Sequence, residues 1–145
     1  MHKMQMIRGL PGSGKSTVAQ EIASAFVVGQ VIICSADDFF KCDYQHNLSG
    51  EYKFNPKLLG EAHAWCRGQA EAGMGLGIEC VIIDNTNTEK WEYEPYLEMA
   101  RRFEYDVDIV VVGKFDEESV KLYAERNSHG VPLEAIQRMA ERFER

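Results

Sequence analysis

Short apolar runs alternate with segments of helical period along this chain. The runs cover residues 4–7, 31–34, 78–83 and 107–112. They are nearly continuous and rich in β-branched residues, which is typical of strands buried on both faces of a parallel sheet. We therefore expect a strand at each of these positions.

Between and after these runs, apolar residues recur at spacings of three and four, as on one face of an amphipathic helix. We expect two consecutive helices after the last strand, separated at residues 127–132 by a glycine stop and a proline start. Asn87 or Thr88 is expected to cap the third helix. The predicted stripes are Val18, Ile22, Ala25 and Phe26; Leu58, Ala62, Trp65 and Cys66; Tyr93, Tyr96, Leu97, Ala100 and Phe103; Val120, Tyr123 and Ala124; and Leu133, Ile136, Ala140 and Phe143.

This alternation predicts an α/β fold with a mostly parallel sheet of four to five strands and helices on both faces. The carboxyl ends of parallel strands meet at one edge, where such sheets bind ligands. Polar residues with chemical uses follow the first three strands, so we expect the functional site at that edge.

Composition limits the kind of protein. A chain of 145 residues that is 45% hydrophobic suits one domain, spanning residues 1–145. The net charge of −7 argues against a strong grip on long nucleic-acid duplexes, which depends on many Lys and Arg contacts to phosphates. No apolar stretch approaches the ~20 residues of a membrane span, and the cysteines show no CxxC spacing. These features predict a cytoplasmic protein without a membrane partner.

Residues 9–16, GLPGSGKS, match the phosphate-loop motif GxxxxGK[ST] in full, after a strand and before a helix. The glycines let successive N–H groups point inward and form an anion site at a helix N-terminus. Lys15 is expected to reach the β- and γ-phosphates, and Ser16 to bind Mg²⁺. The predicted ligand is ATP or another nucleoside triphosphate, held by Gly12, Ser13, Gly14, Lys15, Ser16 and Thr17. The fold expected is therefore a three-layer P-loop NTPase.

Asp37 and Asp38 follow the second strand and face the expected γ-phosphate. A carboxylate there can accept the proton of an attacking hydroxyl. We assign this role to Asp37, which is nearer the strand, and expect Asp38 to point away or to cap a helix. Helix capping by both residues is the competing interpretation.

Asp84 ends the third apolar run, as a Walker-B-type aspartate does. It is expected to orient Mg²⁺-bound water or to hold the acceptor hydroxyl. Asn85 and Asn87 carry amide groups suited to a substrate phosphate, although turn formation and helix capping explain Asn87 equally well. Arg126 stands before a turn between two predicted helices. We expect it to act from a lid, residues 114–132, by neutralising charge on the transferred phosphoryl group and contacting the nucleotide.

Taken together, these motifs resemble the polynucleotide 5′-kinase-like branch of the P-loop kinases. The resemblance rests on GLPGSGKST, SADDFF, VIIDNTNT and the segment ERNSHGVP at residues 125–132, and covers nearly the whole chain. It is strongest toward the kinase domain of animal ubiquitin-ligase-binding polynucleotide kinases and weaker toward phage polynucleotide kinase. It implies that Lys15 and Ser16 bind ATP and Mg²⁺, that Asp37 is the general base, that Asp84 serves the acceptor or the metal, and that Arg126 belongs to a lid.

Two departures from the phage pattern concern the acceptor. The phage enzyme has an arginine three residues after its base, whereas this chain has Phe40 there and Lys41 next. The phage lid also has a second basic residue and a longer turn, whereas the lid turn of this chain offers only His129. Residues 41–55 form a long loop rich in aromatic residues, which could stack on bases of a single-stranded end. We expect the acceptor to be contacted by Asp37, Phe40, Lys41, Asp84, Asn85 and Asn87.

The sequence thus predicts an ATP-dependent kinase whose preferred acceptor is the 5′-OH of DNA or RNA. The alternatives are a kinase of a nucleoside, nucleotide, other small metabolite or hydroxylated base in DNA, and a nucleotide-binding interaction module that hydrolyses ATP slowly.

Overall fold

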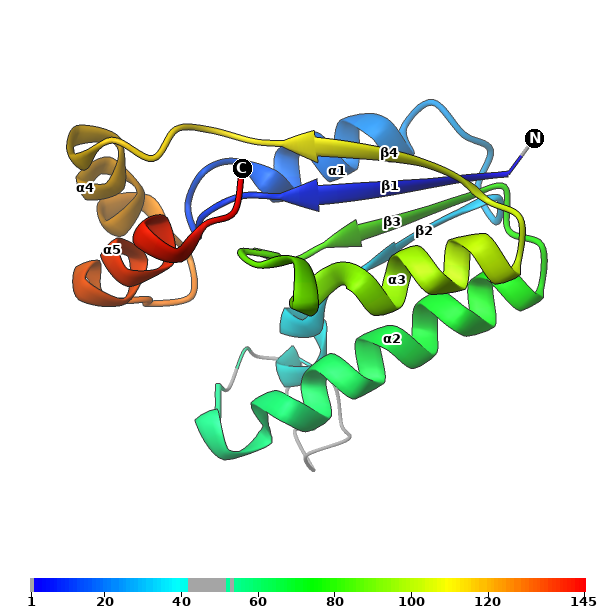
Figure 1. Cartoon of the computed structure of the whole chain (residues 1–145), viewed down its shortest axis with the longest axis horizontal. Coiled ribbons are helices and arrows are strands. Elements are labelled where there is room, and N and C mark those ends of the chain that lie inside the picture. Colours follow the sequence, from blue (N-terminus) through cyan, green and yellow to red (C-terminus); the bar gives the residue numbers. More distant parts are fainter. Residues whose placement is uncertain (1, 42–51, 53) are drawn as a thin grey trace.

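The computed structural model describes residues 2–41, 52 and 54–145. Strands and helices alternate as the hydrophobic pattern predicts (Figure 1). The strands are β1 (Lys3–Arg8), β2 (Val31–Cys34), β3 (Cys80–Asp84) and β4 (Asp106–Val111). The α-helices are α1 (Lys15–Ala23), α2 (Leu59–Gly75), α3 (Lys90–Arg102), α4 (Glu117–Arg126) and α5 (Leu133–Arg142), and the 3-10 helices are η1 (Ala36–Lys41) and η3 (Pro56–Leu58).

The strands form one parallel sheet in the order β2-β3-β1-β4. β1 lies inside the sheet, where Met4 pairs with Val81 of β3 and with Val107 of β4. In Figure 1 all four arrowheads point toward the end of the molecule where α4 and α5 lie. The predicted α/β fold is confirmed, and the polar segments that follow the strands share one edge.

Helices cover both faces of this sheet, as expected. α1 packs on one face in a cluster that includes Ile7 and Ile82. α2 and α3 pack on the other face, over Met4 and Ile83. α4 and α5 pack against each other beyond the carboxyl edge, around the fully buried Leu10 of the phosphate loop. Within the described part of the chain, no helix has both the length and the apolar composition needed to cross a membrane.

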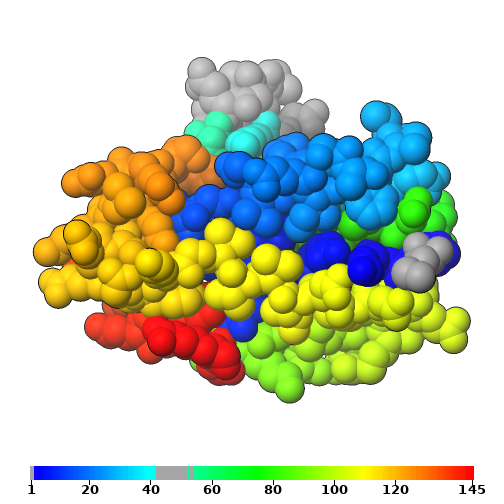
Figure 2. Space-filling model, turned by 90° about the horizontal axis from the view of Figure 1, so that it is seen from above, coloured from blue at the N-terminus to red at the C-terminus, as the bar shows by residue number. Residues whose placement is uncertain are grey.

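The fourth apolar run forms a strand, but its burial differs from the prediction. Val107, Ile109 and Val111 are 37%, 48% and 46% exposed. β4 is an edge strand of the sheet, and Figure 2 shows it at the surface beside α1 and α4. The expectation of burial on both faces is therefore wrong for β4, because a continuous apolar run indicates a strand without indicating its place in the sheet.

The start of α3 also differs from the prediction. Glu89, rather than Asn87 or Thr88, is the N-cap, and Glu92 completes a capping box with it. The Thr88 hydroxyl donates to the Glu92 carboxylate. Asn87 has a φ of +47°, a left-handed conformation that asparagine tolerates better than most residues. The helix can begin only after this turn, which moves the cap along the chain.

A buried arginine joins the end of β1 to two distant segments. Arg8 is only 4% exposed, and its guanidinium lies 4.6 Å from the Tyr93 ring centre and 4.5 Å from that of Phe143. Its Nε donates to the Asn87 carbonyl at 2.8 Å, and Nη2 donates to the carbonyls of Thr88 and Glu144. These bonds fix the segments after β3 and after α5 beside the strand that leads into the phosphate loop.

We expect Arg8→Met to lower the free energy of unfolding by about 3 kcal/mol, because three carbonyls, two of them in buried hydrogen bonds, lose a charged donor and two rings lose a cation. Chemical unfolding followed by circular dichroism measures this. Arg102→Met is the matched control. Arg102 pairs with Glu71 at the surface, so its loss should cost less than about 1 kcal/mol. Equal losses in the two variants would contradict the structural role of Arg8.

Candidate functional site

The segment between β1 and α1 forms the predicted phosphate loop. Gly12 and Gly14 have φ of +80° and +100°, a region that favours glycine. Gly14 is the N-cap of α1, and the Ser13 N–H donates to the Leu10 carbonyl at 3.1 Å. The Ser13 hydroxyl is buried and has no hydrogen-bond partner among the described residues. The loop therefore curves around the N-terminus of α1, whose unpaired N–H groups favour an anion.

The loop is packed tightly against α4 at one glycine and is open at another. A Cβ at Gly12 would lie 2.4 Å from the Tyr123 carbonyl oxygen, whereas one at Gly14 would meet nothing within 4 Å. We expect Gly12→Ala to destabilise the protein by about 3 kcal/mol and Gly14→Ala by about 1 kcal/mol, because the first adds a backbone overlap to the same conformational strain. Thermal unfolding without nucleotide measures both. A larger effect at Gly14 would contradict this packing.

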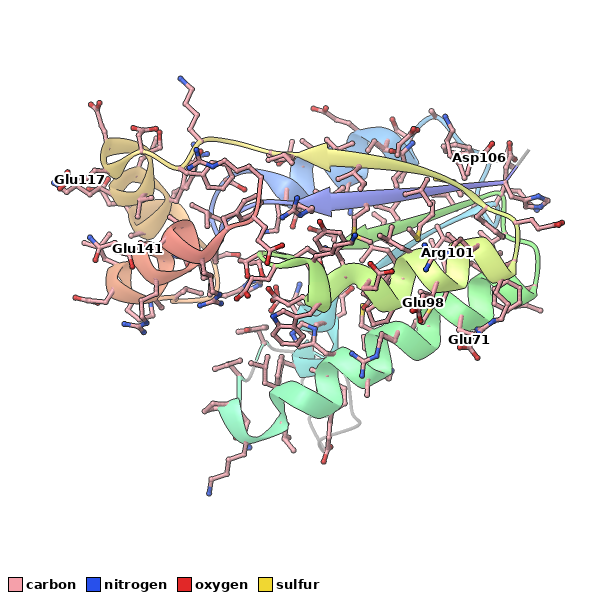
Figure 3. All side chains as sticks on the ribbon, viewed as in Figure 1. Glu71, Glu98, Arg101, Asp106, Glu117 and Glu141 are labelled. Atoms are coloured by element: carbon pink, nitrogen blue, oxygen red, sulfur yellow. The ribbon has the colours of Figure 1, made fainter. Side chains whose placement is uncertain are left out.

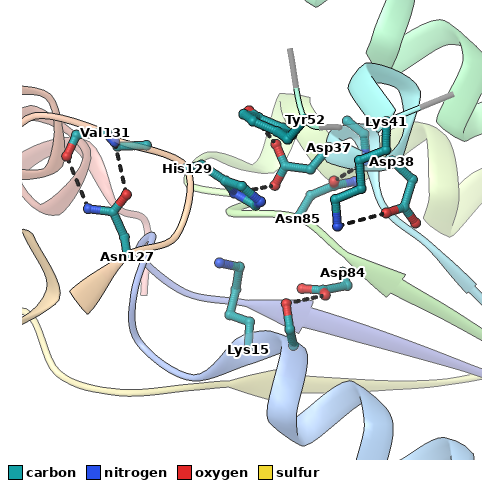
Figure 4. Close-up of polar contacts among 12 residues, drawn as sticks. Lys15, Asp37, Asp38, Lys41, Tyr52, Asp84, Asn85, Asn127, His129 and Val131 are labelled. Carbon is teal, nitrogen blue, oxygen red and sulfur yellow. Dashed lines mark hydrogen bonds and ion pairs between the residues drawn. The ribbon is translucent and has the colours of Figure 1, made fainter. Parts of the chain in front are cut away.

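Ser16 and Asp84 meet between the ends of β1 and β3, and Lys15 lies near them with its Nζ donating to the Leu10 carbonyl at 3.3 Å (Figure 4). Ser16 Oγ donates to Asp84 Oδ2 at 3.2 Å. Burial lowers the pKa of Lys15, while the Asp84 and Asp37 carboxylates raise it. Burial raises the pKa of Asp84, while Lys15 and the Ser16 hydrogen bond lower it. The ammonium and the carboxylate thus stabilise each other's charged state.

Ser16 and Asp84 also fit the predicted metal site. A hydroxyl and a carboxylate, 3.2 Å apart, face each other at the start of α1. Oxygen atoms of this kind are the ligands that Mg²⁺ prefers in proteins. Thr17 follows in the first turn of α1 and is exposed.

The 3-10 helix η1 holds two carboxylates outside the core. Its residues Ala36, Phe39 and Phe40 are buried, whereas the side chains of Asp37 and Asp38 are each 47% exposed. Asp38 Oδ1 lies 3.8 Å from Lys41 Nζ. Burial raises the pKa of Asp38, and the Lys41 charge lowers it. Because the apolar side chains of η1 face the core, the side chains of Asp37, Asp38 and Lys41 lie outside it, at the carboxyl edge of the sheet.

Asp37 has two neighbours that the sequence did not identify as site residues. His129 Nδ1, from the turn between α4 and α5, lies 3.3 Å from Asp37 Oδ2. Tyr52 Oη donates to Asp37 Oδ1 at 3.4 Å. The Tyr52 and His129 rings stack, with centres 4.3 Å apart and planes 23° from parallel. The sequence marked His129 only as a basic residue of the lid turn, and Tyr52 only as part of the aromatic loop at residues 41–55.

A cavity of about 280 Å³ opens among these groups. Figure 4 shows Lys15 and Asp84 on one side, with Asp37, Asp38, Lys41 and His129 on the other. The residues that line the cavity include Ser16, Asp37, Asp38, Lys41, Asp84 and His129. The structure therefore brings together predicted residues from the phosphate loop, η1 and the end of β3.

Three predicted acceptor contacts lie away from this cavity. Phe40 is fully buried in the core beside Tyr52 and Phe54. The Asn85 side chain is buried, accepts from the Ala36 N–H at 2.9 Å and thereby holds the start of η1. Asn87 is buried and donates to the Ile7 carbonyl at 3.0 Å. In this structure the three side chains support the protein interior, Phe40 by packing and the two asparagines by hydrogen bonds, and their direct contact with an acceptor stays a prediction.

Arg126 ends α4 and contacts the phosphate loop. Its Nε donates to the Gly12 carbonyl at 2.7 Å, and its guanidinium lies 5.3 Å from the Tyr123 ring centre. The following turn is held by Asn127, which donates to the Val131 carbonyl at 3.1 Å and accepts from the Val131 N–H at 2.9 Å. Arg126 thus lies at the loop expected to hold the nucleotide.

The long aromatic loop is described only at its ends. Residues 42–51 and 53, including Tyr44, lie outside the described residues. Phe39 is buried in the core, whereas Phe54 is 50% exposed. The Tyr52 ring contacts the rings of both Phe40 and Phe54.

Comparison with known families identifies the domain. The family model described as "AAA domain" matches residues 4–145. The chain belongs to this family. It is 38% identical over 140 residues to human NEDD4-binding protein 2, covering 97% of this chain and 8% of that protein. It is 34% identical over 106 residues to the 2′,3′-cyclic-nucleotide 3′-phosphodiesterase of Pongo abelii, covering 72% of this chain and 23% of that protein. The AAA domain therefore spans less than a quarter of the length of either relative.

Solved structures show the same fold. One chain of a structure titled "Structure of the Pnkp1/Rnl/Hen1 RNA repair complex" superposes with a TM-score of 0.72 at 20% identity, covering 97% of this chain and 43% of that one. A gluconokinase from Sinorhizobium meliloti superposes with a TM-score of 0.63 at 17% identity, covering 99% of this chain and 75% of that one. The AAA domain therefore has the three-layer fold of P-loop kinases.

Proposed function

We propose that this AAA domain is an ATP-dependent kinase that transfers the γ-phosphoryl group to an alcohol, with the 5′-OH of DNA or RNA as the acceptor. The observation that carries the proposal is the cavity in which Ser16 and Asp84 face Asp37. Phosphoryl transfer requires the donor phosphates on one side of the acceptor oxygen and a proton acceptor on the other. A cavity of about 280 Å³ between such groups accommodates a small part of a larger acceptor, such as a chain end.

The donor side of the site binds and orients the triphosphate. The N–H groups at the start of α1 and the Lys15 ammonium hold the β- and γ-phosphates, as in other phosphate loops. Arg126, now bonded to the Gly12 carbonyl, is close enough to the loop to neutralise charge that develops on the transferred group. Ser16 and Asp84 would hold Mg²⁺, which supplies charge neutralisation between the β- and γ-phosphates.

The acceptor side supplies the base. The Asp37 carboxylate takes the proton of the acceptor hydroxyl as that oxygen forms a bond to the γ-phosphorus. The bond between the γ-phosphorus and the β,γ-bridging oxygen breaks, and ADP leaves. The result is a phosphate monoester and a protonated Asp37, which returns its proton to solvent. Asp37 is suited to this step because its side chain is about half exposed within the cavity.

The acidic composition is compatible with a nucleic-acid end as acceptor. The carboxylates of Glu71, Glu98, Asp106, Glu117 and Glu141 belong to exposed residues on the outer surface (Figure 3). Lys41 and His129 are basic side chains at the cavity itself. A kinase that binds one strand end needs only a few local cations, whereas gripping a duplex along its length needs many.

Transfer from γ-labelled ATP to a panel of acceptors tests the proposal. The panel contains 5′-OH DNA and RNA oligonucleotides, hydroxymethylated DNA, nucleosides and small alcohols. We expect labelled oligonucleotide, with 5′-phosphorylated oligonucleotide as the negative control. Label on hydroxymethylated DNA regardless of its 5′ end would assign the acceptor to a hydroxylated base. Release of phosphate without any labelled product would favour a nucleotide-binding module.

A small metabolite is the second candidate acceptor. The cavity is small, about 280 Å³, and the net charge of −7 disfavours binding of a long anionic substrate. Both observations favour a small metabolite. Labelling of a nucleoside or small alcohol with a higher kcat/KM than any oligonucleotide would support this candidate over a polynucleotide.

A further inference from the structure

We propose that His129 is a positioning residue for Asp37, so that the end of α4 and the turn after it carry one residue for each substrate: Arg126 for the nucleotide and His129 for the base that activates the acceptor. This inference rests on the proposed function and extends it to a residue outside the phosphate loop and η1. The inference is supported by the contacts of Asp37, by the hydrogen bonds within the turn, and by the places of Arg126 and His129.

Both oxygens of the Asp37 carboxylate have a neighbour. His129 Nδ1 lies 3.3 Å from Oδ2, and Tyr52 Oη donates to Oδ1 at 3.4 Å. Burial, and then the charge of Asp37, raise the pKa of the Tyr52 phenol, so Tyr52 keeps its proton and remains a donor. A carboxylate held at both oxygens has a restricted rotation, which a base needs in order to aim one lone pair at the acceptor hydroxyl.

The two neighbours also hold each other. The His129 ring stacks on Tyr52 at 4.3 Å, and Tyr52 packs edge-on against the buried Phe40 ring at 5.9 Å. His129 is therefore connected through Tyr52 to the hydrophobic core. Its side chain is 26% exposed, less than that of Asp37 at 47%, which is consistent with a supporting rather than a reacting group.

The turn that carries His129 has a defined shape. The Asn127 side chain bonds to both the N–H and the carbonyl of Val131, and Gly130 has a φ of +68° that closes the turn. Arg126 immediately precedes this turn and is bonded to the phosphate loop at Gly12. Adjoining residues of one segment thus place Arg126 at the phosphate loop and His129 at Asp37 in the cavity.

Asp37 shares the cavity with other carboxylates. Those of Asp38 and Asp84 line the same cavity, and Lys41 is paired with Asp38. His129 is the basic side chain that lies against Oδ2 of Asp37, at 3.3 Å, and it brings no additional negative charge into the site.

The test compares the kinetics of His129→Ala with those of the wild type, using the acceptor that the panel identifies. We expect kcat to fall about 10- to 100-fold, the size of effect that follows from misplacing a reacting group, while the Kd for ATP changes less than about threefold. His129→Gln, which retains a donor, should recover part of kcat. His2→Ala is the control, because His2 contacts the Gly77 carbonyl outside the cavity.

A double-mutant cycle with Asp37→Asn separates positioning from a structural role. If His129 acts through Asp37, adding His129→Ala to Asp37→Asn should lower kcat less than about twofold further. A kcat for His129→Ala within threefold of wild type, or a full additional loss in the double variant, would overturn the inference.

A measurement that does not depend on catalysis distinguishes failure of this inference from failure of the proposed function. Amide hydrogen exchange of residues 127–131 should be faster in Asp37→Ala than in the wild type, because the turn loses its contact with η1. If no acceptor is phosphorylated, the proposed function fails, and faster exchange would still support the contact on which the positioning role depends. Unchanged exchange would overturn that contact even in an active kinase.

Discussion

Asp37→Asn is expected to reduce phosphoryl transfer by about 10²- to 10⁴-fold, the usual contribution of a general base. The amide has nearly the size of the carboxylate but cannot take the proton of the acceptor hydroxyl. The side chain is about half exposed, and its contacts to His129 and Tyr52 are 3.3 and 3.4 Å long. Little folding stability should therefore be lost. Steady-state rates with γ-labelled ATP, together with nucleotide titration and thermal unfolding, measure these effects.

Asp38→Asn is the matched control for Asp37→Asn. Asp38 is equally exposed and lines the same cavity, but it is paired with Lys41. We expect its replacement to lower kcat less than about tenfold, with the larger change in the KM for the acceptor. A greater loss of kcat in Asp38→Asn than in Asp37→Asn would transfer the role of base to Asp38.

Lys15→Ala is expected to lower transfer by about 10²- to 10³-fold and to weaken nucleotide binding by about tenfold to 100-fold, because a charged donor to the phosphates is removed. Lys15→Arg keeps the positive charge and is the matched variant. We expect it to bind nucleotide more tightly than Lys15→Ala while remaining a poor catalyst, because the guanidinium differs from the ammonium in shape and reach. Nucleotide titration and single-turnover transfer measure the two effects separately.

The Lys15 variants should also differ in pH dependence. Burial raises the pKa of Asp84, and Lys15 opposes this shift. Removing the ammonium therefore raises the pKa of Asp84 further, so Asp84 becomes protonated at a higher pH. Mg²⁺-dependent nucleotide binding of Lys15→Ala should decline at a higher pH than that of the wild type as the pH falls, while Lys15→Arg should follow the wild type. Identical pH profiles for all three proteins would contradict this coupling.

Much of the fold could be predicted because its signals are local. Residues 31–34 form β2 as expected, and most of the stripe around Tyr96 lies on α3. Val18 and Ile22 lie on α1, but that helix ends at Ala23, before the last two residues of the predicted stripe. The start of α3 was missed because the left-handed turn at Asn87 delays the helix by a few residues. The exposure of β4 was missed because strand order depends on contacts between distant segments.

The site residues that belong to local motifs could also be predicted from the sequence. Ser16 and Asp84 come together as their motifs indicated, because Ser16 lies at the start of α1, after the loop that follows β1, and Asp84 ends the neighbouring strand β3. Asn85 was expected at the substrate, but its amide holds the Ala36 N–H instead. A polar side chain near a strand end can face the cavity or support the backbone beside it, and residue type does not distinguish these two orientations.

The sequence by itself determined the parts of this protein that depend on the backbone of a few consecutive residues. The glycines, Lys15 and Ser16 of the phosphate loop specify an anion site wherever the strand and helix around them form. Tertiary structure alone decided which groups surround Asp37. His129 and Tyr52 come from separate segments and meet at its carboxylate, because parallel strands gather their carboxyl ends at one edge and the α4–α5 pair packs over that edge. Contacts of this kind depend on the packing of whole elements, so they leave no fixed spacing in the sequence.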